Sequence, residues 1–283
     1  MDRIEYLNNE AIISEDGAYV SSLTLGGITA IQSSVDGYKT HGGISLLIPY
    51  ADIVYGAKYG FEGIEYTLPK NATYENDFKN SIHGLTNDLR WNVKKKMDGY
   101  LKMACIVKNP GYPSKLEASV TYKLKHNSFN IEISLKNLGE RSCPVMVGLH
   151  PYFKSDGNWK IICDEPLVSL KGITDKEVQS DLLHIDPFES YEISNNNRRT
   201  FDDCFFGGGT IHIITNNTTI ELRRDNLHFF SVYNGPFAPK NSFSIVPMSA
   251  APNSFNNKFG LKSLKPKESF NCRLSIKLLN QLP

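Results

Sequence analysis

Apolar and polar residues alternate along much of the chain, with the two-residue period of a strand that is buried on one face. The clearest alternation covers residues 116–124, and a second one covers residues 129–135. Their apolar positions are Leu116, Ala118, Val120, Tyr122 and Leu124, then Phe129, Ile131, Ile133 and Leu135. The residues between them, 125–128, are polar and suit a turn. The pattern therefore predicts a β-hairpin.

Further strands are predicted towards both ends of the chain. Residues 211–213 and 220–222 are expected to form a second hairpin that turns at Asn216-Asn217. Alternation over residues 270–278 predicts that the chain ends in a strand. Near the N-terminus, Gly26-Gly27 interrupts an apolar stretch and predicts a bend or bulge.

Helical periodicity is weak by comparison. Residues 175–183 are the best candidate for a helix, and a short one. Residues 55–80 are rich in Gly, Asn and Lys, and they predict surface loops with one or two short strands at most. No repeat or long linker divides the chain. We therefore predict an all-β fold, a large and mostly antiparallel β-sandwich that forms one domain over residues 1–283.

The balance of charge narrows the class of partner. Lys and Arg number 31 against 30 Asp and Glu, which gives a formal net charge of +1. This balance gives no reason to expect nucleic acid or an anionic membrane surface as a partner. The sequence contains no apolar run of membrane-spanning length, and Met1 to Glu5 do not resemble a signal peptide, so a cytoplasmic location is expected. The five cysteines are scattered and form no Cys-x-x-Cys pair, which argues against a disulfide framework or a zinc site.

The apolar run 145–147 predicts a buried strand, and His150 is expected where that strand ends. Pro151 has no backbone N–H and keeps the residue before it extended. A neutral imidazole held in such a place can take or give a proton near pH 7. The alternative is a core histidine that hydrogen-bonds a backbone carbonyl.

Three other stretches could carry chemistry. Ser81-Ile82-His83-Gly84 places a histidine at a strand-to-loop junction, and residues 200–205 place Asp202 and Asp203 between aromatic residues. Residues 243–256 form a strand that runs into a loop rich in Pro and Asn. Each stretch also has an ordinary structural interpretation as a turn or loop. No histidines are paired at metal-ligand spacing, so neither a metal nor another cofactor is predicted.

In this order, the stretches resemble the aldose 1-epimerase, or galactose mutarotase, family. His150-Pro151-Tyr152-Phe153 is similar to its His-Pro-Tyr-Phe motif, which is the most specific piece. His83-Gly84 is similar to its first His-Gly, and Asp202 matches its sugar-binding Asp. Residues 247–256 resemble its C-terminal loop. The resemblance covers most of the chain, from about residue 42 to about residue 256.

The resemblance implies a galactose mutarotase-like supersandwich that binds a free sugar and needs no cofactor. It also implies that the protein interconverts α and β anomers. One group takes the proton of the C1 hydroxyl, and another protonates the ring oxygen. By resemblance, His150 would be the acid, His83 a second catalytic and sugar-binding partner, and Asp202 an acceptor for a sugar hydroxyl.

The chain departs from the family at two positions. The family's base is a Glu directly before the proline that opens the C-terminal loop, where this chain has Val246. The family also carries an Asn-Arg pair where this chain has Asp52-Ile53. Losing the Glu and the Arg together leaves no unpaired buried charge, which indicates divergence rather than random loss.

Two functions remain open after these departures. In the first, the protein is still a sugar isomerase, with Asp52 or a bound water as base. In the second, it is a non-catalytic carbohydrate-binding or sensing protein. For both, we expect His83, His150, Asp202 and Asp52 to converge on one open concave pocket, with Val246 at its edge, at the end of a strand.

Overall fold

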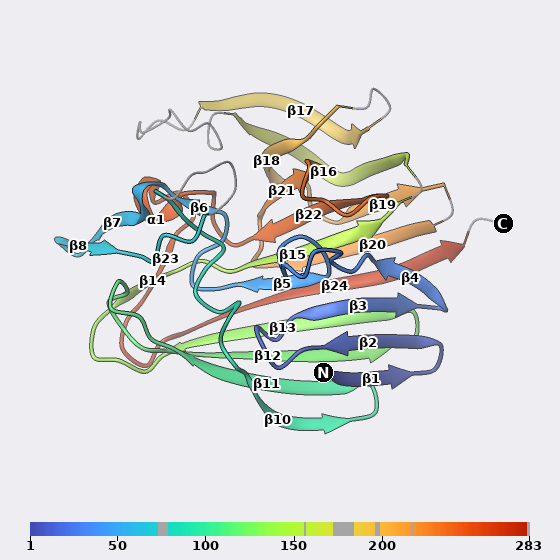
Figure 1. Ribbon diagram of the computed structural model, residues 1–283. Helices are drawn as coiled ribbons and strands as arrows, with labels where there is room; N and C mark the ends of the chain where they lie inside the picture. Colours follow the sequence, from blue (N-terminus) through green and yellow to red (C-terminus); the bar gives the residue numbers. More distant parts are fainter. Residues whose placement is uncertain (73–78, 156, 172–183, 196–198, 217, 282–283) are drawn as a thin grey trace.

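The computed structural model is built almost entirely of antiparallel strands (Figure 1). It describes residues 1–72, 79–155, 157–171, 184–195, 199–216 and 218–281. The predicted all-β, antiparallel fold class is confirmed. The helix predicted over 175–183 lies outside the described residues.

Eighteen strands join into one hydrogen-bonded sheet that folds into two layers. In spatial order the first layer holds β10 (Asn92–Met97), β11 (Tyr100–Val107), β12 (Leu116–Lys125), β13 (Ser128–Asn137), β24 (Ser269–Gln281), β20 (Thr218–Asp225), β19 (Ile211–Thr215), β16 (Trp159–Lys171) and β17 (His184–Ser194). The second layer holds β1 (Asp2–Tyr6), β2 (Asn9–Ile13), β3 (Val20–Leu25), β4 (Ile28–Ile31), β5 (Ile44–Leu47), β15 (Gly148–Lys154), β22 (Ser242–Met248), β21 (Phe229–Tyr233) and β18 (Asp202–Gly207). Pairing of β16 with β18 joins the layers.

Short elements sit outside this sheet as three two-stranded ribbons. They are β6 (Ile53–Val54) with β9 (Ser81–Ile82), β7 (Lys58–Phe61) with β8 (Ile64–Thr67), and β14 (Cys143–Val145) with β23 (Lys262–Leu264). A 3-10 turn (Tyr55–Ala57) and α1 (Ser254–Asn257) lie beside them. The described residues of 55–80 thus contain two short strands, within the one or two that were predicted.

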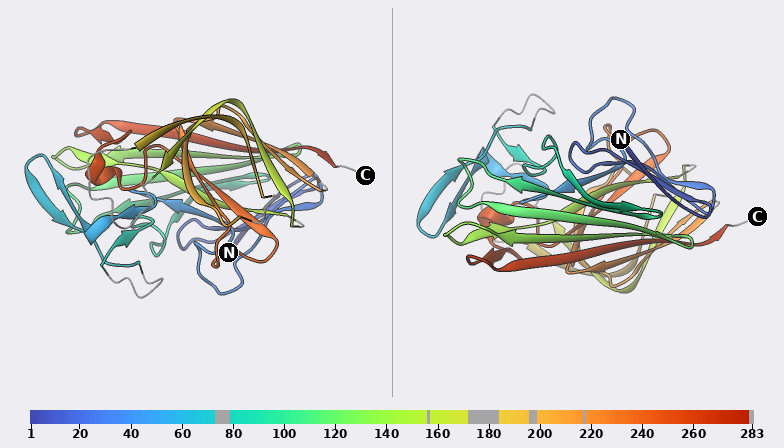
Figure 2. Two further views of the ribbon diagram at one scale, coloured as in Figure 1. Left: turned by 90° about the horizontal axis from the view of Figure 1, so that it is seen from above. Right: turned by 90° about the horizontal axis from the view of Figure 1, so that it is seen from below.

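The predicted hairpins are present. Strands β12 and β13 pair along their whole length, from Leu116 opposite Asn137 to Lys125 opposite Ser128. Strands β19 and β20 form the second hairpin, with Ile213 opposite Ile220. The C-terminal strand is β24, which pairs with β13 on one side and β20 on the other. Figure 2 shows β11, β12, β13 and β24, coloured green to red, running side by side along the molecule.

The core lies between the two layers. Strand alternation turns one side chain in two inward, so the first-layer strands contribute Leu, Ile, Val and Phe to a single cluster of buried apolar residues. Trp159 of β16 stacks on Phe243 of β22 with ring centroids 4.2 Å apart, which joins the layers directly. Burial of the apolar surface of this cluster is the main favourable contribution to the free energy of folding.

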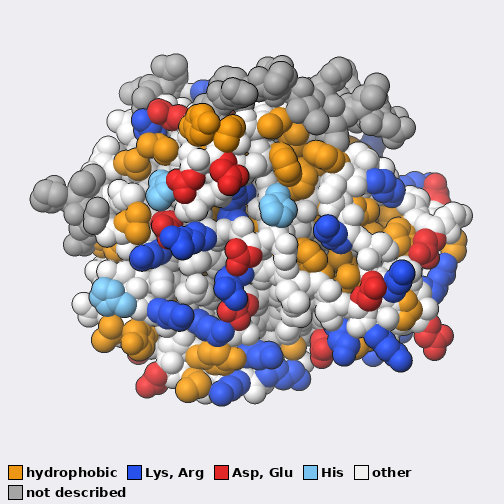
Figure 3. Space-filling model, turned by 180° about the vertical axis from the view of Figure 1, so that it is seen from behind, with side chains coloured by type: hydrophobic (Ala, Val, Ile, Leu, Met, Phe, Trp, Pro, Cys, Tyr) orange, Lys and Arg blue, Asp and Glu red, His pale blue; other side chains and the backbone are white. Residues whose placement is uncertain are grey.

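The outer surface carries both signs of charge. Lys and Arg side chains are interspersed with Asp and Glu side chains on the face seen in Figure 3. In the part of the chain that the structure describes, no helix is long and apolar enough to span a membrane.

One local expectation was wrong. Residues 145–147 do not form one strand that ends at His150, because β14 stops at Val145 and β15 starts at Gly148. His150 therefore lies inside β15, with Ser45 opposite it on β5.

The position of β24 between β13 and β20 predicts a test of the core. Leu274 is fully buried, and its replacement by alanine is expected to lower the free energy of unfolding by about 2–5 kcal/mol, through lost apolar burial and a residual cavity. Lys277→Ala, at an exposed position of the same strand, should change it by about 0.5 kcal/mol or less. Urea denaturation of both variants measures the difference. Equal effects of the two changes would contradict the layer assignment.

Candidate functional site

The pairing register of the second-layer strands sets several predicted site residues opposite one another, in rows that run across the sheet. Strand β22 lies between β21 and β15, and its Val246 pairs with Ser231 of β21. The register that sets Tyr152 opposite Ser244 also sets His150 opposite Val246. Opposed residues of antiparallel strands project from the same face. His150, Val246 and Ser231 therefore form one row across the sheet.

Asp202 belongs to the neighbouring row on this face. It pairs with Tyr233, which pairs in turn with Ser244. Asp203 is one residue further along β18, so it projects from the opposite face. There the Arg199 guanidinium donates to its two carboxylate oxygens at 2.9 and 2.8 Å. Of the two adjacent carboxyl groups, Asp202 is thus the one on the face that carries His150.

His83 and Asp52 reach this face from the short ribbon of β6 and β9. Ile53 pairs with Ile82, and one step further the His83 N–H donates to the Asp52 carbonyl at 2.9 Å. Both residues have left-handed backbones, with φ of 60° at His83 and 56° at Asp52. Such conformations are uncommon for residues other than glycine and often occur at functional sites.

The glycine after His83 permits this arrangement. Gly84 has φ of +83°, and a Cβ there would lie 2.4 Å from the Ile48 carbonyl oxygen. The N–H of Leu85 donates to that same oxygen at 2.6 Å. The His-Gly dipeptide is therefore a tight turn that passes against the backbone beside β5.

The two histidines are in direct contact. The ring centroids of His83 and His150 are 5.3 Å apart and the rings are perpendicular. Tyr152 stacks on the other side of His150 at 4.8 Å. Burial lowers the pKa of His83 to about 4 and holds that of His150 well below its usual value, with proximity to other histidines adding to both shifts. Both rings are therefore neutral at pH 7.

The two imidazoles differ in their hydrogen bonds. His83 Nδ1 is buried and makes no hydrogen bond to any described residue. His150 Nδ1 lies 3.0 Å from the Ser244 hydroxyl, which itself donates to the Pro151 carbonyl at 2.8 Å. His150 is thus held by the protein, whereas His83 offers a buried polar atom that a ligand hydroxyl could satisfy.

Asp52 is the second carboxyl group of the site. Burial, and then repulsion from Asp202, raise the pKa of Asp52 to about 7. Asp52 in turn contributes to the raised pKa of the Cys204 thiol, which occupies the row of His150. Asp52 therefore interacts with both rows, with Asp202 in one and Cys204 in the other. The structure thus brings together four residues that are widely separated in the sequence: Asp52, His83, His150 and Asp202.

Val246 lies within the site but not at a strand end. Strand β22 continues two residues beyond it, to Met248, and its side chain is 5% exposed. The expectation of a strand end is therefore corrected. The position remains adjacent to His150 across the sheet.

The Pro- and Asn-rich loop after β22 supports Asp52. The side-chain oxygen of Asn253 accepts from the Tyr55 N–H at 3.2 Å, and the Asn253 N–H donates to the Ile53 carbonyl at 3.0 Å. These bonds fix the segment that directly follows Asp52. The loop thus positions a site residue through the backbone.

Sequence reasoning missed two further residues near the histidines. Ser244 is two positions before Val246, so strand alternation alone would have placed it on the site face. His41 lies in the loop before β5, where its Nδ1 is 2.7 Å from an Asp36 oxygen and its ring stacks on Phe237 at 4.8 Å. No motif in the sequence indicates His41.

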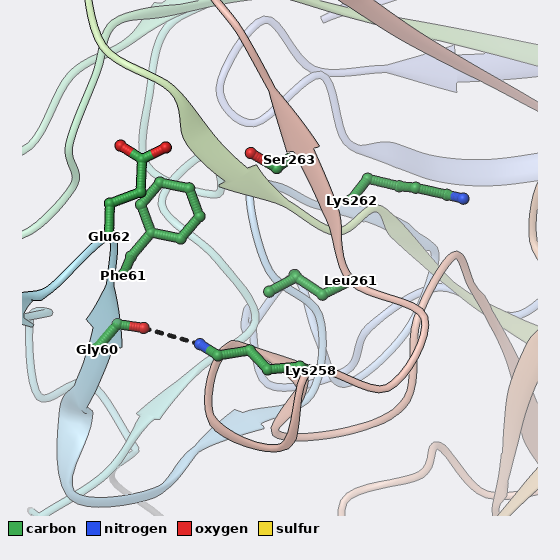
Figure 4. Close-up of a pocket in the computed structure, with 7 residues that line it drawn as sticks. All are labelled: Gly60, Phe61, Glu62, Lys258, Leu261, Lys262 and Ser263. Carbon is green, nitrogen blue, oxygen red and sulfur yellow. Dashed lines mark hydrogen bonds between the residues drawn. The ribbon is translucent and has the colours of Figure 1, made fainter.

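A separate cavity of about 260 Å³ lies between the β7–β8 ribbon and the segment after α1 (Figure 4). Phe61 and Leu261 supply its apolar wall, and the Lys258 ammonium donates to the Gly60 carbonyl at 2.8 Å. It shares no lining residue with the histidine cluster. Among the described residues, no group of three His, Cys, Asp or Glu side chains is placed to hold a metal ion.

The fold is a large antiparallel β-sandwich, and one of its faces carries two neutral histidines and two carboxyl groups. Such a polar site is suited to a hydroxyl-rich ligand. The family model for aldose 1-epimerase matches residues 4–277. The chain belongs to the aldose 1-epimerase family.

Individual relatives are more distant. The chain is 26% identical over 239 residues to the uncharacterized protein YihR of Escherichia coli K12, covering 80% of this chain and 76% of that protein. A galactose mutarotase-like protein of Clostridium acetobutylicum superposes with a TM-score of 0.83 at 19% identity, covering 98% of this chain and 94% of that one. One from Lactobacillus casei gives 0.81 at 16% identity, covering 99% and 100%. These structures show the shared fold.

The turn at His83-Gly84 yields a prediction about stability. Gly84→Ala adds a left-handed alanine, which costs roughly 1–2 kcal/mol, and also a clash with the backbone at Ile48. Gly27→Ala is a matched control, because Gly27 has φ of +81° but open space around its Cβ position. We expect Gly84→Ala to lower the free energy of unfolding by more than Gly27→Ala does. Thermal and urea unfolding of the pair would measure this, and equal losses would show that close approach at Gly84 is unimportant.

Proposed function

We propose that the site binds a monosaccharide and interconverts its anomers, as expected for an aldose 1-epimerase. The observation that supports this most is the contact of His83 with His150, with Asp52 and Asp202 beside it. Mutarotation needs two groups that exchange protons with neighbouring oxygens of one pyranose ring. Neutral imidazoles and a carboxyl group with a pKa near 7 can do so at neutral pH without a cofactor.

Each residue has a proposed role. His150 and His83 are the catalytic pair, and His83 also binds the sugar through its buried Nδ1. Asp202 accepts hydrogen bonds from sugar hydroxyls, because it is exposed on the site face, whereas Asp203 projects from the opposite face. Asp52 is the second carboxyl group that faces the sugar. Galactose and glucose are the first sugars to test, since structures described as galactose mutarotase-like share this fold.

A second function is supported by the family resemblance, which implies that Val246 stands where the family has its base. A valine cannot accept a proton. The protein would then be a carbohydrate-binding or sensing protein on the same scaffold. Polarimetry on anomerically pure sugars, beside calorimetry on the same sugars, separates binding with turnover from binding alone.

Asp202 provides a test of sugar binding. Asp202→Asn is expected to weaken binding of the best-bound aldose by about 1–3 kcal/mol, because hydrogen bonds to a charged acceptor are lost. Asp203→Asn removes the same charge from the other face and should leave affinity within about 0.5 kcal/mol of the wild type. Isothermal calorimetry measures both variants. A larger loss in Asp203→Asn would reverse the assignment of the two carboxyl groups.

Val246 provides a test of catalysis. Val246→Glu is expected to raise the mutarotation rate by at least about 10-fold, because it restores a carboxylate beside His150; a positioned general base contributes about 10²–10⁴-fold. The gain falls short of that range because burial raises the pKa of a carboxyl group at this site. Adding Ile53→Arg should raise the rate further by supplying an opposite charge.

Polarimetry or exchange NMR on anomerically pure glucose and galactose would measure these rates. His150→Ala is the control, and it should remove activity from both the wild type and Val246→Glu. Vigorous wild-type turnover that His150→Ala leaves unchanged would refute the proposed roles.

A further inference from the structure

The hydrogen bonds of Ser244 fix which nitrogen of His150 carries the proton. A serine hydroxyl has one proton to donate. Ser244 Oγ lies 2.8 Å from the Pro151 carbonyl oxygen, which can only accept, so the hydroxyl proton is used there. The 3.0 Å contact between Ser244 Oγ and His150 Nδ1 must then be a bond that Nδ1–H donates. In the neutral ring, Nε2 is therefore the atom with the free lone pair.

This tautomer sets the direction in which His150 exchanges a proton. A neutral imidazole with a bare Nε2 can take a proton from a ligand but has none to give at that atom. The titratable groups near His150 are His83 and His41 from other elements and Tyr152 from its own strand, and none of them is a carboxylate that would stabilise an imidazolium at rest. The resting His150 is thus prepared to act as a base.

The second proton must come from another group near the sugar. Asp52 adjoins His83 through a backbone hydrogen bond, and the His83 ring contacts that of His150. Burial is the main factor that disfavours the charged form of Asp52, the Asp202 carboxylate adds to it, and a hydrogen bond from the Ile53 backbone opposes it. A carboxyl group in such surroundings keeps a proton that it can donate.

Resting on the proposed function, we infer that His150 is the base that takes the C1 hydroxyl proton and that Asp52 is the acid that protonates the ring oxygen. This reverses the role that the family resemblance implies for His150. These roles need no carboxylate at Val246, so a faster Val246→Glu variant would support the roles that the resemblance implies, and a variant with no gain would support the roles inferred here. Ser244 is a positioning residue, since it acts through His150 and not on the sugar.

The step balances without any co-reactant. The C1 hydroxyl proton goes to His150 Nε2 as the C1=O double bond forms. The bond from C1 to the ring oxygen breaks, its electron pair stays on that oxygen, and the Asp52 proton joins it. After rotation about C1–C2, the former ring oxygen attacks the other face of C1 and returns its proton to Asp52. The imidazolium proton of His150 goes to the carbonyl oxygen, which becomes the new C1 hydroxyl.

The tautomer is tested without any assay of activity. Long-range ¹H–¹⁵N spectra of histidine-labelled protein distinguish Nδ1–H from Nε2–H rings, and His150→Ala identifies its signals among those of seven histidines. We expect the Nδ1–H form near pH 7. Ser244→Ala should give a mixture of tautomers, and Ser244→Thr should retain the Nδ1–H form. An Nε2–H ring in the wild type would overturn the inference.

The proton donor is tested by the pH dependence of the rate. Because Asp52 must be protonated and its pKa is about 7, mutarotation of a bound aldose should fall about 10-fold for each pH unit above that value. Asp52→Asn should lower the rate by about 10²–10⁴-fold. Asp203→Asn is the matched control and should leave the rate unchanged. A rate that rises through pH 6–8, or an Asp52→Asn variant with full activity, would overturn the inference.

Calorimetry on the same samples separates this inference from the proposed function. Sugar binding without turnover at any pH would overturn the acid and base assignment and leave sugar binding in place. Failure to bind any aldose would overturn both.

Discussion

An interruption in the pairing of β15 with β22 is the constraint on which the site depends. These strands pair at Gly148 and Met248 and again from Tyr152 and Ser244 onward, with no paired residues between. Pro151 and Pro247 lie in this gap, and neither has an N–H to donate. The Ser244 hydroxyl instead satisfies the Pro151 carbonyl. His150 and Val246 lie opposite each other in the same gap. The gap therefore determines both the position of His150 in the site and, through Ser244, its tautomer.

Strand alternation predicted much of this arrangement, and its limits are physical. It predicted the hairpins and the antiparallel class, because burial of one face leaves a two-residue period in the sequence. It could not show that β15 begins at Gly148, since proline inside a paired strand is unusual and Pro151 favoured a strand end. The choice of Asp202 over Asp203 also needed a register, because a shift of one residue exchanges the two faces.

The candidate residues were predictable as a set but not as a geometry. Ordered motifs identified His83, His150 and Asp202, and the departure from the family identified Asp52 and Val246. The two histidines are 67 positions apart, and their contact depends on the short ribbon of β6 and β9. Each of these strands has only two residues, which is too short to leave a recognisable pattern in the sequence. Ser244 and His41 carry no motif. Strand alternation places Ser244 on the site face, but only the fold shows its hydrogen bond to His150 and the presence of His41 nearby.

The apolar side chain of Val246 affects the electrostatics around His150. A carboxylate beside His150 would favour the imidazolium and give that ring a proton to donate. With an apolar side chain there, burial dominates, and the pKa of His150 lies well below its usual value. The neutral ring then needs a partner that holds a proton at neutral pH, and Asp52 is such a group because burial and Asp202 both oppose its ionisation. With the roles proposed above, the valine at position 246 and the carboxyl group at position 52 form one consistent arrangement, in which His150 accepts the proton and Asp52 donates it.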